Sequence, residues 1–180
     1  MKVLIVYASR HGSTKEIAEA IGGVLELRGL DAKVVDAAMA FGILSYDAII
    51  VGSAVFSGKW MQSARSFVEI YKNELAQRPL WLFSSGPIGE PLKPADDEAV
   101  HIQDIAAAVG AREHQLFAGK LDKGTLGFGE RALATAVRAQ EGDFRNWDTI
   151  TAWANHIADA LETTKEGTSW TTPSPTTTTP

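Results

Sequence analysis

Apolar runs alternate with amphipathic stretches along most of the chain, and this alternation predicts an α/β fold. The run KVLIVYA is apolar throughout, as expected for a strand buried on both faces of a parallel sheet. Strands are predicted at residues 2–8, 31–37, 46–55, 80–86 and 113–121. Helical periodicity is found at residues 13–29, 61–77, 97–111, 129–140 and 146–162.

Alternating strands and helices require a parallel sheet, because right-handed crossovers place helices on both of its faces. Five strands suit a doubly wound sheet with the order 2-1-3-4-5, whose ligand crevice lies at the carboxyl ends of the first and third strands. At the first helix, Ser13 and Glu16 have the spacing of a capping box, and Gly29 stands where a C-cap glycine is expected. In the last helix, the inner stripe is expected to be Ile150, Trp153, Ile157 and Leu161.

The composition indicates a single domain at residues 1–162, followed by a disordered tail at 163–180 that is rich in Thr and Pro. The net charge of −5 argues against general nucleic-acid binding. The chain has no cysteine, which removes disulfides and thiol chemistry and fits a cytoplasmic location. No apolar run reaches the roughly 20 residues of a membrane span, whereas contact with a membrane surface and the oligomeric state stay open.

The segment SRHGST, at residues 9–14, joins the first strand to the first helix and is called the first loop below. The first N–H groups of a helix lack intrahelical partners and carry partial positive charge. The hydroxyls of Ser9, Ser13 and Thr14 add donors, and Gly12 lets the backbone turn closely around a ligand oxygen. The first loop therefore predicts a phosphate site, although Ser13 as a simple helix cap is the plainer alternative.

Three other phosphate-binding motifs are excluded, because the chain lacks the residues that they require. The segment GSAVFSGKW has five residues between its glycines and Trp60 where a Walker loop needs Ser or Thr. No G-x-G-x-x-G follows the first strand, which disfavours a dinucleotide site. A phosphoacceptor domain would need an acidic pair after the first strand and an Asp after the third, but those places hold Ser9, Arg10 and Ser53.

The first loop resembles the phosphate loop of flavodoxin-like FMN proteins. The resemblance extends to the second loop, SAVFSGKW at 53–60, and the third loop, SSGPIGE at 84–90, which in that family enclose the isoalloxazine ring. Within the family, VGSAVFSGKW, LFAGKLD and NWDTITAWANHIADAL resemble the flavodoxin-domain group of menaquinone-dependent protoporphyrinogen dehydrogenase. The insert at 123–145 departs from that group, because it holds fewer arginines and aromatic residues.

The resemblance implies FMN as the cofactor and assigns its contacts. Phe56 and Trp60 are candidates to lie against the flavin ring, and one of the two is expected to be a core residue instead. Gly58 is the expected place for a peptide that reorients near flavin N5. The phosphate contacts are expected from Ser9, Arg10, His11, Gly12, Ser13 and Thr14. Backbone contacts are expected from Ser53, Ala54, Val55, Ser57 and Gly58, and contacts with the pyrimidine edge from Ser84, Ser85, Gly86, Pro87, Ile88 and Gly89.

The resemblance implies an FMN-dependent oxidoreductase that passes electrons from a reduced organic substrate, protoporphyrinogen being one candidate, to a quinone or similar acceptor. No catalytic side chain is expected, since flavin N5 carries the chemistry. No metal site is expected either, because the histidines and acids lack ligand spacing. The alternatives are a flavodoxin-type electron shuttle between redox partner proteins, supported by Glu90, Asp96, Asp97 and Glu98, and an interaction module without cofactor.

Overall fold

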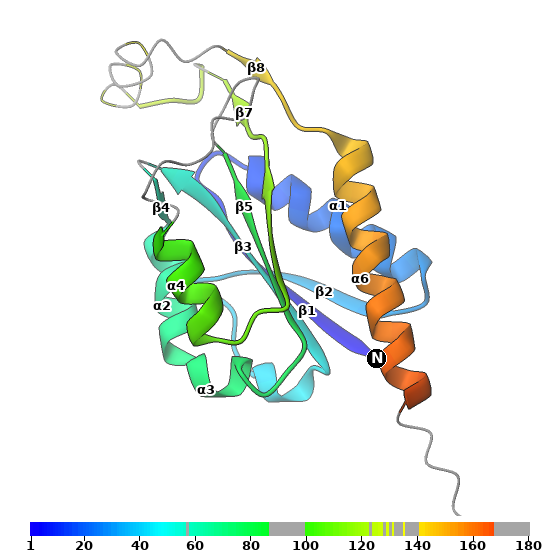
Figure 1. Ribbon diagram of the computed structural model, residues 1–180. Helices are drawn as coiled ribbons and strands as arrows, with labels where there is room; N and C mark the ends of the chain where they lie inside the picture. The colour runs from blue at the N-terminus through cyan, green and yellow to red at the C-terminus, as the bar shows by residue number, and fades with distance from the viewer. Residues whose placement is uncertain are drawn as a thin grey trace, which may run out of the picture.

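A parallel sheet extended by one short antiparallel strand forms the centre of the structure (Figure 1). The structure is a computed structural model that describes residues 1–56, 58–86, 100–122, 124–127, 129, 131, 135 and 141–167. Its strands are β1 (Lys2–Ala8), β2 (Asp31–Asp36), β3 (Ala48–Phe56), β4 (Lys59–Trp60), β5 (Leu80–Ser85) and β6 (Glu113–Phe117). The parallel strands lie in the order β2-β1-β3-β5-β6, and β4 pairs with β3. This order is the predicted 2-1-3-4-5 arrangement, so the fold class is confirmed.

Helices cover both faces of the sheet, as Figure 1 shows. The helices are α1 (Ser13–Leu27), η1 (Ile43–Ser45), α2 (Gln62–Ile70), α3 (Lys72–Leu75), α4 (Val100–Ala108) and α6 (Trp147–Gly167). One apolar cluster packs α1 and α6 against the sheet, and a second packs α2, α3 and α4 against the opposite face. None of the helices in the described part of the chain is long and apolar enough to cross a membrane.

The continuous apolar runs arise because each central strand is buried on both faces. In β1, Val3 and Ile5 belong to the cluster under α1 and α6, whereas Leu4 and Val6 belong to the cluster under α2 and α4. Successive side chains of a strand point to opposite faces, so a doubly covered strand needs an apolar residue at every position. The helix prediction for the last segment holds as well, since its whole inner stripe is buried: Ile150, Trp153, Ile157 and Leu161.

The largest differences from the sequence prediction concern three elements. The helix predicted at 61–77 divides at Tyr71 into α2 and α3. The last predicted strand ends at Phe117, and residues 120–121 form a separate strand, β7 (Lys120–Leu121), paired with β8 (Gly142–Asp143). Helix α6 continues to Gly167, beyond residue 162 where the domain was expected to end. Residues 168–180, and most of the helix predicted at 129–140, lie outside the described residues.

The ends of α1 confirm one cap and correct the other. Gly29 has φ +76° and its N–H donates to the carbonyl of Glu26, as a glycine C-cap requires. At the start, the cap residue is Gly12 with φ +87°, and Ser13 is already helical. The capping-box prediction is therefore wrong. The Glu16 carboxylate accepts a hydrogen bond from Arg145 Nη1 at 2.7 Å, which this sequence spacing cannot reveal.

Arg145 joins the β7–β8 hairpin to the start of α1. Its side chain is only 3% exposed, and it also donates from Nε and Nη2 to the Asp143 carboxylate at 2.8 and 2.6 Å. Hydrogen bonding from Arg145 is the main cause that lowers the pKa of Asp143. The guanidinium stacks over Trp147, 4.5 Å from the ring centroid. A buried arginine needs such partners, because an unpaired buried charge is costly.

A buried hydrogen-bond chain connects β4, β5 and β6. Trp60 Nε1 donates to Ser84 Oγ at 2.8 Å, and Ser84 Oγ lies 2.8 Å from His114 Nε2. An indole N–H can only donate, so the Ser84 hydroxyl hydrogen stays free to reach Nε2 of a neutral His114. Burial lowers the pKa of His114, which favours that neutral form. These two hydrogen bonds give partners to the Trp60 indole, the Ser84 hydroxyl and the His114 imidazole at an otherwise apolar face of the sheet.

Replacing Gly52 by alanine is expected to destabilise the fold. An added Cβ at Gly52 would lie 2.0 Å from Cζ of Phe83, its partner residue on β5. Phe83 packs against Phe117 and Trp153, so its ring has little room to move. Gly52→Ala should cost about 1–3 kcal/mol of unfolding free energy, measured by urea denaturation. In the control Gly23→Ala, no atom lies within 4 Å of the added Cβ, and a helical alanine should gain about 0.5–1 kcal/mol. Equal stability of the two variants would contradict this packing.

Protonation of His114 is expected to weaken the fold as the pH falls. Because burial lowers its pKa below the ordinary 6.5, the unfolded chain binds this proton at higher pH than the folded chain. The contribution to stability is therefore complete above about pH 6.5 and is lost as the pH drops below that value, by at most about 1.4 kcal/mol per pH unit. Urea unfolding between pH 5 and 8 should show a shallower decline for His114→Gln than for the wild type. Parallel curves for the two proteins would refute the coupling.

Candidate functional site

Three loops meet at the carboxyl edge of the sheet. Strands β1, β3 and β5 are parallel neighbours, with Ala8 opposite Ser53 and Ser53 opposite Ser84. The first loop follows β1, the second loop begins within β3 and includes β4, and the third loop begins in β5. Parallel pairing therefore brings segments about 45 and 75 residues apart to one place, as predicted for a doubly wound sheet.

The first loop ends in a helix start whose donors are not used by a cap. Gly12 adopts the left-handed conformation, and no side chain caps the N-terminus of α1. Ser13 Oγ is buried and has no hydrogen-bond partner, which is unusual for a buried hydroxyl. Thr14 is 1% exposed, whereas Arg10 and His11 are exposed and Ser9 is half-buried.

The second loop lies beside the first. The guanidinium of Arg10 stands over the ring of Phe56, 5.7 Å from its centroid, which links the two loops. Phe56 is 47% exposed and is thus available to a ligand. Gly58 has φ +72°, a conformation that glycine adopts without strain. Ala54 and Val55 are half-buried, and Ser57 lies outside the described residues.

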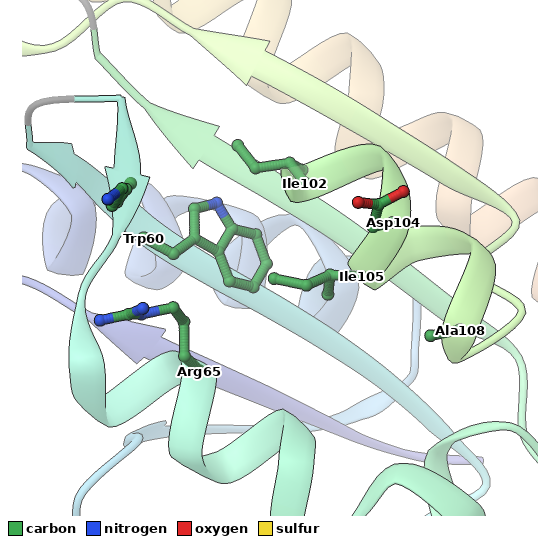
Figure 2. Close-up of a pocket in the computed structure, with 7 residues that line it drawn as sticks. Trp60, Arg65, Ile102, Asp104, Ile105 and Ala108 are labelled. Atoms are coloured by element: carbon green, nitrogen blue, oxygen red, sulfur yellow. The ribbon is translucent and has the colours of Figure 1, made fainter. Parts of the chain in front are cut away.

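Trp60 does not fit the role of a flavin platform. It is only 2% exposed, and its indole belongs to the apolar cluster under α2 and α4. Figure 2 shows its ring facing Ile102 and Ile105 of α4. Of the two aromatic candidates, Phe56 is exposed and Trp60 is the core residue, because the short strand β4 turns Trp60 back onto the sheet.

The serines at the ends of β3 and β5 have structural hydrogen bonds. Ser53 Oγ donates to the carbonyl of Ala54 and accepts from the N–H of Met61, both at 2.9 Å. Ser84 Oγ is engaged by Trp60 and His114. Their side chains are therefore not free for a ligand.

The remainder of the third loop is described only in part. Ser85 is 6% exposed, and Gly86 has φ +109° with its N–H bonded to the carbonyl of Phe117. A Cβ added at Gly119 would lie 3.5 Å from the nitrogen of Gly86, so the segment after β6 closes against this loop. Pro87, Ile88 and Gly89 lie outside the described residues.

Sequence reasoning missed Arg145 as a neighbour of the first loop. Its Nη1 lies 3.4 Å from the carbonyl of Ser13 and bonds to Glu16, a residue 129 positions away in the chain. Glu16 places a negative charge in the first turn of α1, and Arg145 compensates it. An anion at this helix start thus meets less repulsion. No sequence signal marks this pair, because only the β7–β8 hairpin brings Arg145 back to α1.

The residues at the start of α1 fit the phosphate of FMN. An uncapped helix N-terminus, a left-handed glycine and a buried hydroxyl without a partner together form a set of donors that lacks an acceptor. The charged residues within the described parts of the three loops are cations, Arg10 and Lys59. A dianionic phosphate would supply the missing acceptor and would match this sign of charge.

Solved structures that resemble this chain include flavodoxins and a larger oxidoreductase. An archaeal flavodoxin is 21% identical, with 90% of this chain and 99% of that chain covered and a TM-score of 0.58. A mutant of flavodoxin from Pseudomonas aeruginosa is 16% identical over the same shares, with a TM-score of 0.57. Rubredoxin oxygen:oxidoreductase from Desulfovibrio gigas is 17% identical over 90% of this chain and 36% of that chain, with a TM-score of 0.62. At these identities the likeness shows the fold.

The family of the chain is established by its sequence. No curated protein matches it. The family model of the flavodoxin domain matches residues 4–148, which include all three loops, Glu16 and Arg145. Because this match covers well over half of the chain, the protein belongs to the flavodoxin domain family, and FMN is its cofactor, as the sequence predicted.

Proposed function

We propose that this protein is an FMN-dependent oxidoreductase that holds the FMN phosphate at the start of α1. The observation that carries the proposal is the buried Ser13 hydroxyl, which has no partner at a helix N-terminus without a side-chain cap. A buried polar group without a partner costs free energy, which a phosphate oxygen would recover. The other phosphate contacts in this proposal come from Ser9, Arg10, His11, Gly12 and Thr14.

The residues of the chain bind and orient, and the flavin supplies the redox chemistry. When bound, FMN would accept two electrons from a reduced organic substrate and pass them on to an acceptor such as a quinone. Phe56, which is exposed and carries Arg10 above its ring, would pack against the isoalloxazine. Gly58 would present its peptide to the ring near N5, since its backbone already has positive φ. Backbone groups of 53–55 and 84–86 would line the rest of the ring.

The proposed substrate is an organic anion, with protoporphyrinogen as the first candidate and menaquinone as the acceptor. Arg10 supports an anionic substrate, because it stands over the exposed ring of Phe56 and the described parts of the loops hold no carboxylate. The second-loop sequence VGSAVFSGKW, which resembles that of the protoporphyrinogen dehydrogenase group, supports the choice of candidate.

A second candidate function is an electron shuttle that exchanges single electrons with a redox partner protein. Membership of the flavodoxin domain family favours it. The acidic face that such a shuttle would present rests on Glu90, Asp96, Asp97 and Glu98, which lie outside the described residues.

Removing the Ser13 hydroxyl is expected to weaken FMN binding without weakening the fold. Ser13 Oγ has no protein partner, so Ser13→Ala should leave the free energy of unfolding of the FMN-free protein unchanged or slightly higher. A hydrogen bond to a charged phosphate is worth roughly 1.5–3 kcal/mol, so the Kd for FMN should rise roughly ten- to a hundredfold. Titration of flavin fluorescence measures the Kd for FMN of Ser13→Ala and of the wild type.

Riboflavin provides the control for this variant, because it carries the same ring without a phosphate. The Kd for riboflavin should be the same for Ser13→Ala and the wild type. Equal loss for both flavins would place the phosphate elsewhere, and so would an unchanged Kd for FMN.

The proposed reaction is tested with the FMN-loaded protein under anaerobic conditions. Protoporphyrinogen should bleach the flavin absorbance, menadione should restore it, and protoporphyrin should accumulate over many turnovers. A shuttle would instead accumulate one-electron-reduced flavin over a wide potential range during redox titration. Absence of turnover with both reagents would reject the dehydrogenase function and leave the shuttle as the explanation.

A further inference from the structure

A cavity lies on the helix side of Trp60, apart from the exposed ring of Phe56. Its volume is about 370 Å³, within the range of small-molecule sites. It lies between β4, α2 and α4, and its lining includes Lys59, Trp60, Arg65, Ile102, Asp104 and Ile105. Figure 2 shows Arg65 and the two isoleucines around the indole ring of Trp60.

The inner wall of the cavity is apolar and fixed in position. Trp60 and Ile102 are 2% and 6% exposed, and Ile105 is half-buried. The indole cannot rotate freely, because its N–H is bonded to Ser84 in the buried chain that ends at His114. Trp60 thus fixes the floor beneath the more exposed apolar residues of the lining, Ile105 and Ala108, so an apolar body can pack there without ordering the wall first.

Two cations stand on the β4 and α2 side of the cavity. Lys59 and Arg65 are exposed, and neither forms an ion pair with another residue in the described part of the chain. Arg65 Nη2 donates to the amide oxygen of Gln62 at 2.6 Å, which orients the guanidinium and leaves its other N–H groups available. On the α4 side, Asp104 provides one carboxylate. The lining is thus net positive in a chain whose net charge is −5.

We propose that this cavity binds an organic anion with an apolar body. The carboxylate or similar anionic group would pair with Lys59 and Arg65, and the apolar body would pack on Ile105 and Ala108, above the floor that Trp60 and Ile102 form. Asp104 would accept a hydrogen bond from a donor at the far end of the ligand. The inference does not depend on FMN binding, since the cavity residues other than Lys59 and Trp60 belong to α2 and α4.

The test uses 2-naphthoate as the anionic probe and 2-naphthamide as its neutral counterpart. Isothermal titration calorimetry is run on the full chain both without FMN and with FMN in excess. Naphthoate is expected to bind in both conditions. It should also shift the NMR signal of the Trp60 indole N–H, which is assigned by its absence from the spectrum of Trp60→Phe. Naphthoate binding that vanishes when FMN is added would overturn the proposal, because the probe would then occupy the flavin loops.

Charge and shape are tested by separate variants. Arg65→Gln should weaken naphthoate binding about tenfold, the loss expected for one charge-assisted hydrogen bond, and should change naphthamide binding by less than about twofold. Ala108→Phe adds bulk at an exposed position of the lining, so it should weaken both probes. Lys72→Gln is the matched control, because it removes an exposed cation of α3 that does not line the cavity.

The outcomes separate this inference from the proposed function. The Kd for FMN should be unchanged in Arg65→Gln and Ala108→Phe. Absence of naphthoate binding to the wild type would overturn the cavity assignment, and so would an equal loss of both probes in Arg65→Gln. A protein that failed to bind FMN but bound naphthoate with this pattern would retain the cavity site and lose the flavin function.

Discussion

The parallel register of β1, β3 and β5 is the constraint on which the candidate site depends. These strands end together at one edge, so the segments that follow them must meet there. Gly52 is part of this constraint, because only a residue without a side chain leaves room for Phe83 on the neighbouring strand. Phe83 in turn packs with Phe117 and Trp153, which connects the sheet to α6. The core thus fixes the positions of the loops, and the loops are free to carry ligand-binding residues.

The start of α1 combines a local cause with a distant one. Gly12 and Ser13 follow β1 directly and leave helix donors and a buried hydroxyl without acceptors. Arg145 arrives from the β7–β8 hairpin and compensates Glu16 in the first turn. The helix N-terminus supplies partial positive charge, and the ion pair keeps the nearby carboxylate from opposing it. An anion is therefore favoured here by backbone, side chain and long-range pairing together.

Trp60 separates two environments that the sequence places side by side. The second-loop residues that precede Trp60 include Phe56, which lies beside Arg10 of the first loop. The ring of Trp60, in contrast, is packed under α2 and α4 and is held by its hydrogen bond to Ser84. A short antiparallel pairing of β4 with β3 reverses the chain at Gly58 and produces this separation. The second loop and the cavity lined by Arg65 therefore share Trp60 as a wall while presenting different chemistry. Phe56 with Arg10 above its ring lies on one side, and Lys59 and Arg65 lie beside an apolar surface on the other.

The sequence by itself predicted the strand order, because alternating strands and helices joined by right-handed crossovers suit a doubly wound sheet. It determined the buried stripe of α6 and the composition of the first loop, because these follow from periodicity and from residues that are neighbours in the chain. It also determined the family, through three loops in the right order. Only the tertiary structure decided that Trp60 is buried while Phe56 is exposed, and that Ser13 is helical without capping α1. It alone paired Arg145 with Glu16 and placed Lys59 and Arg65 around one cavity. Such contacts depend on how separate elements pack, and spacing along the chain carries no signal of that packing.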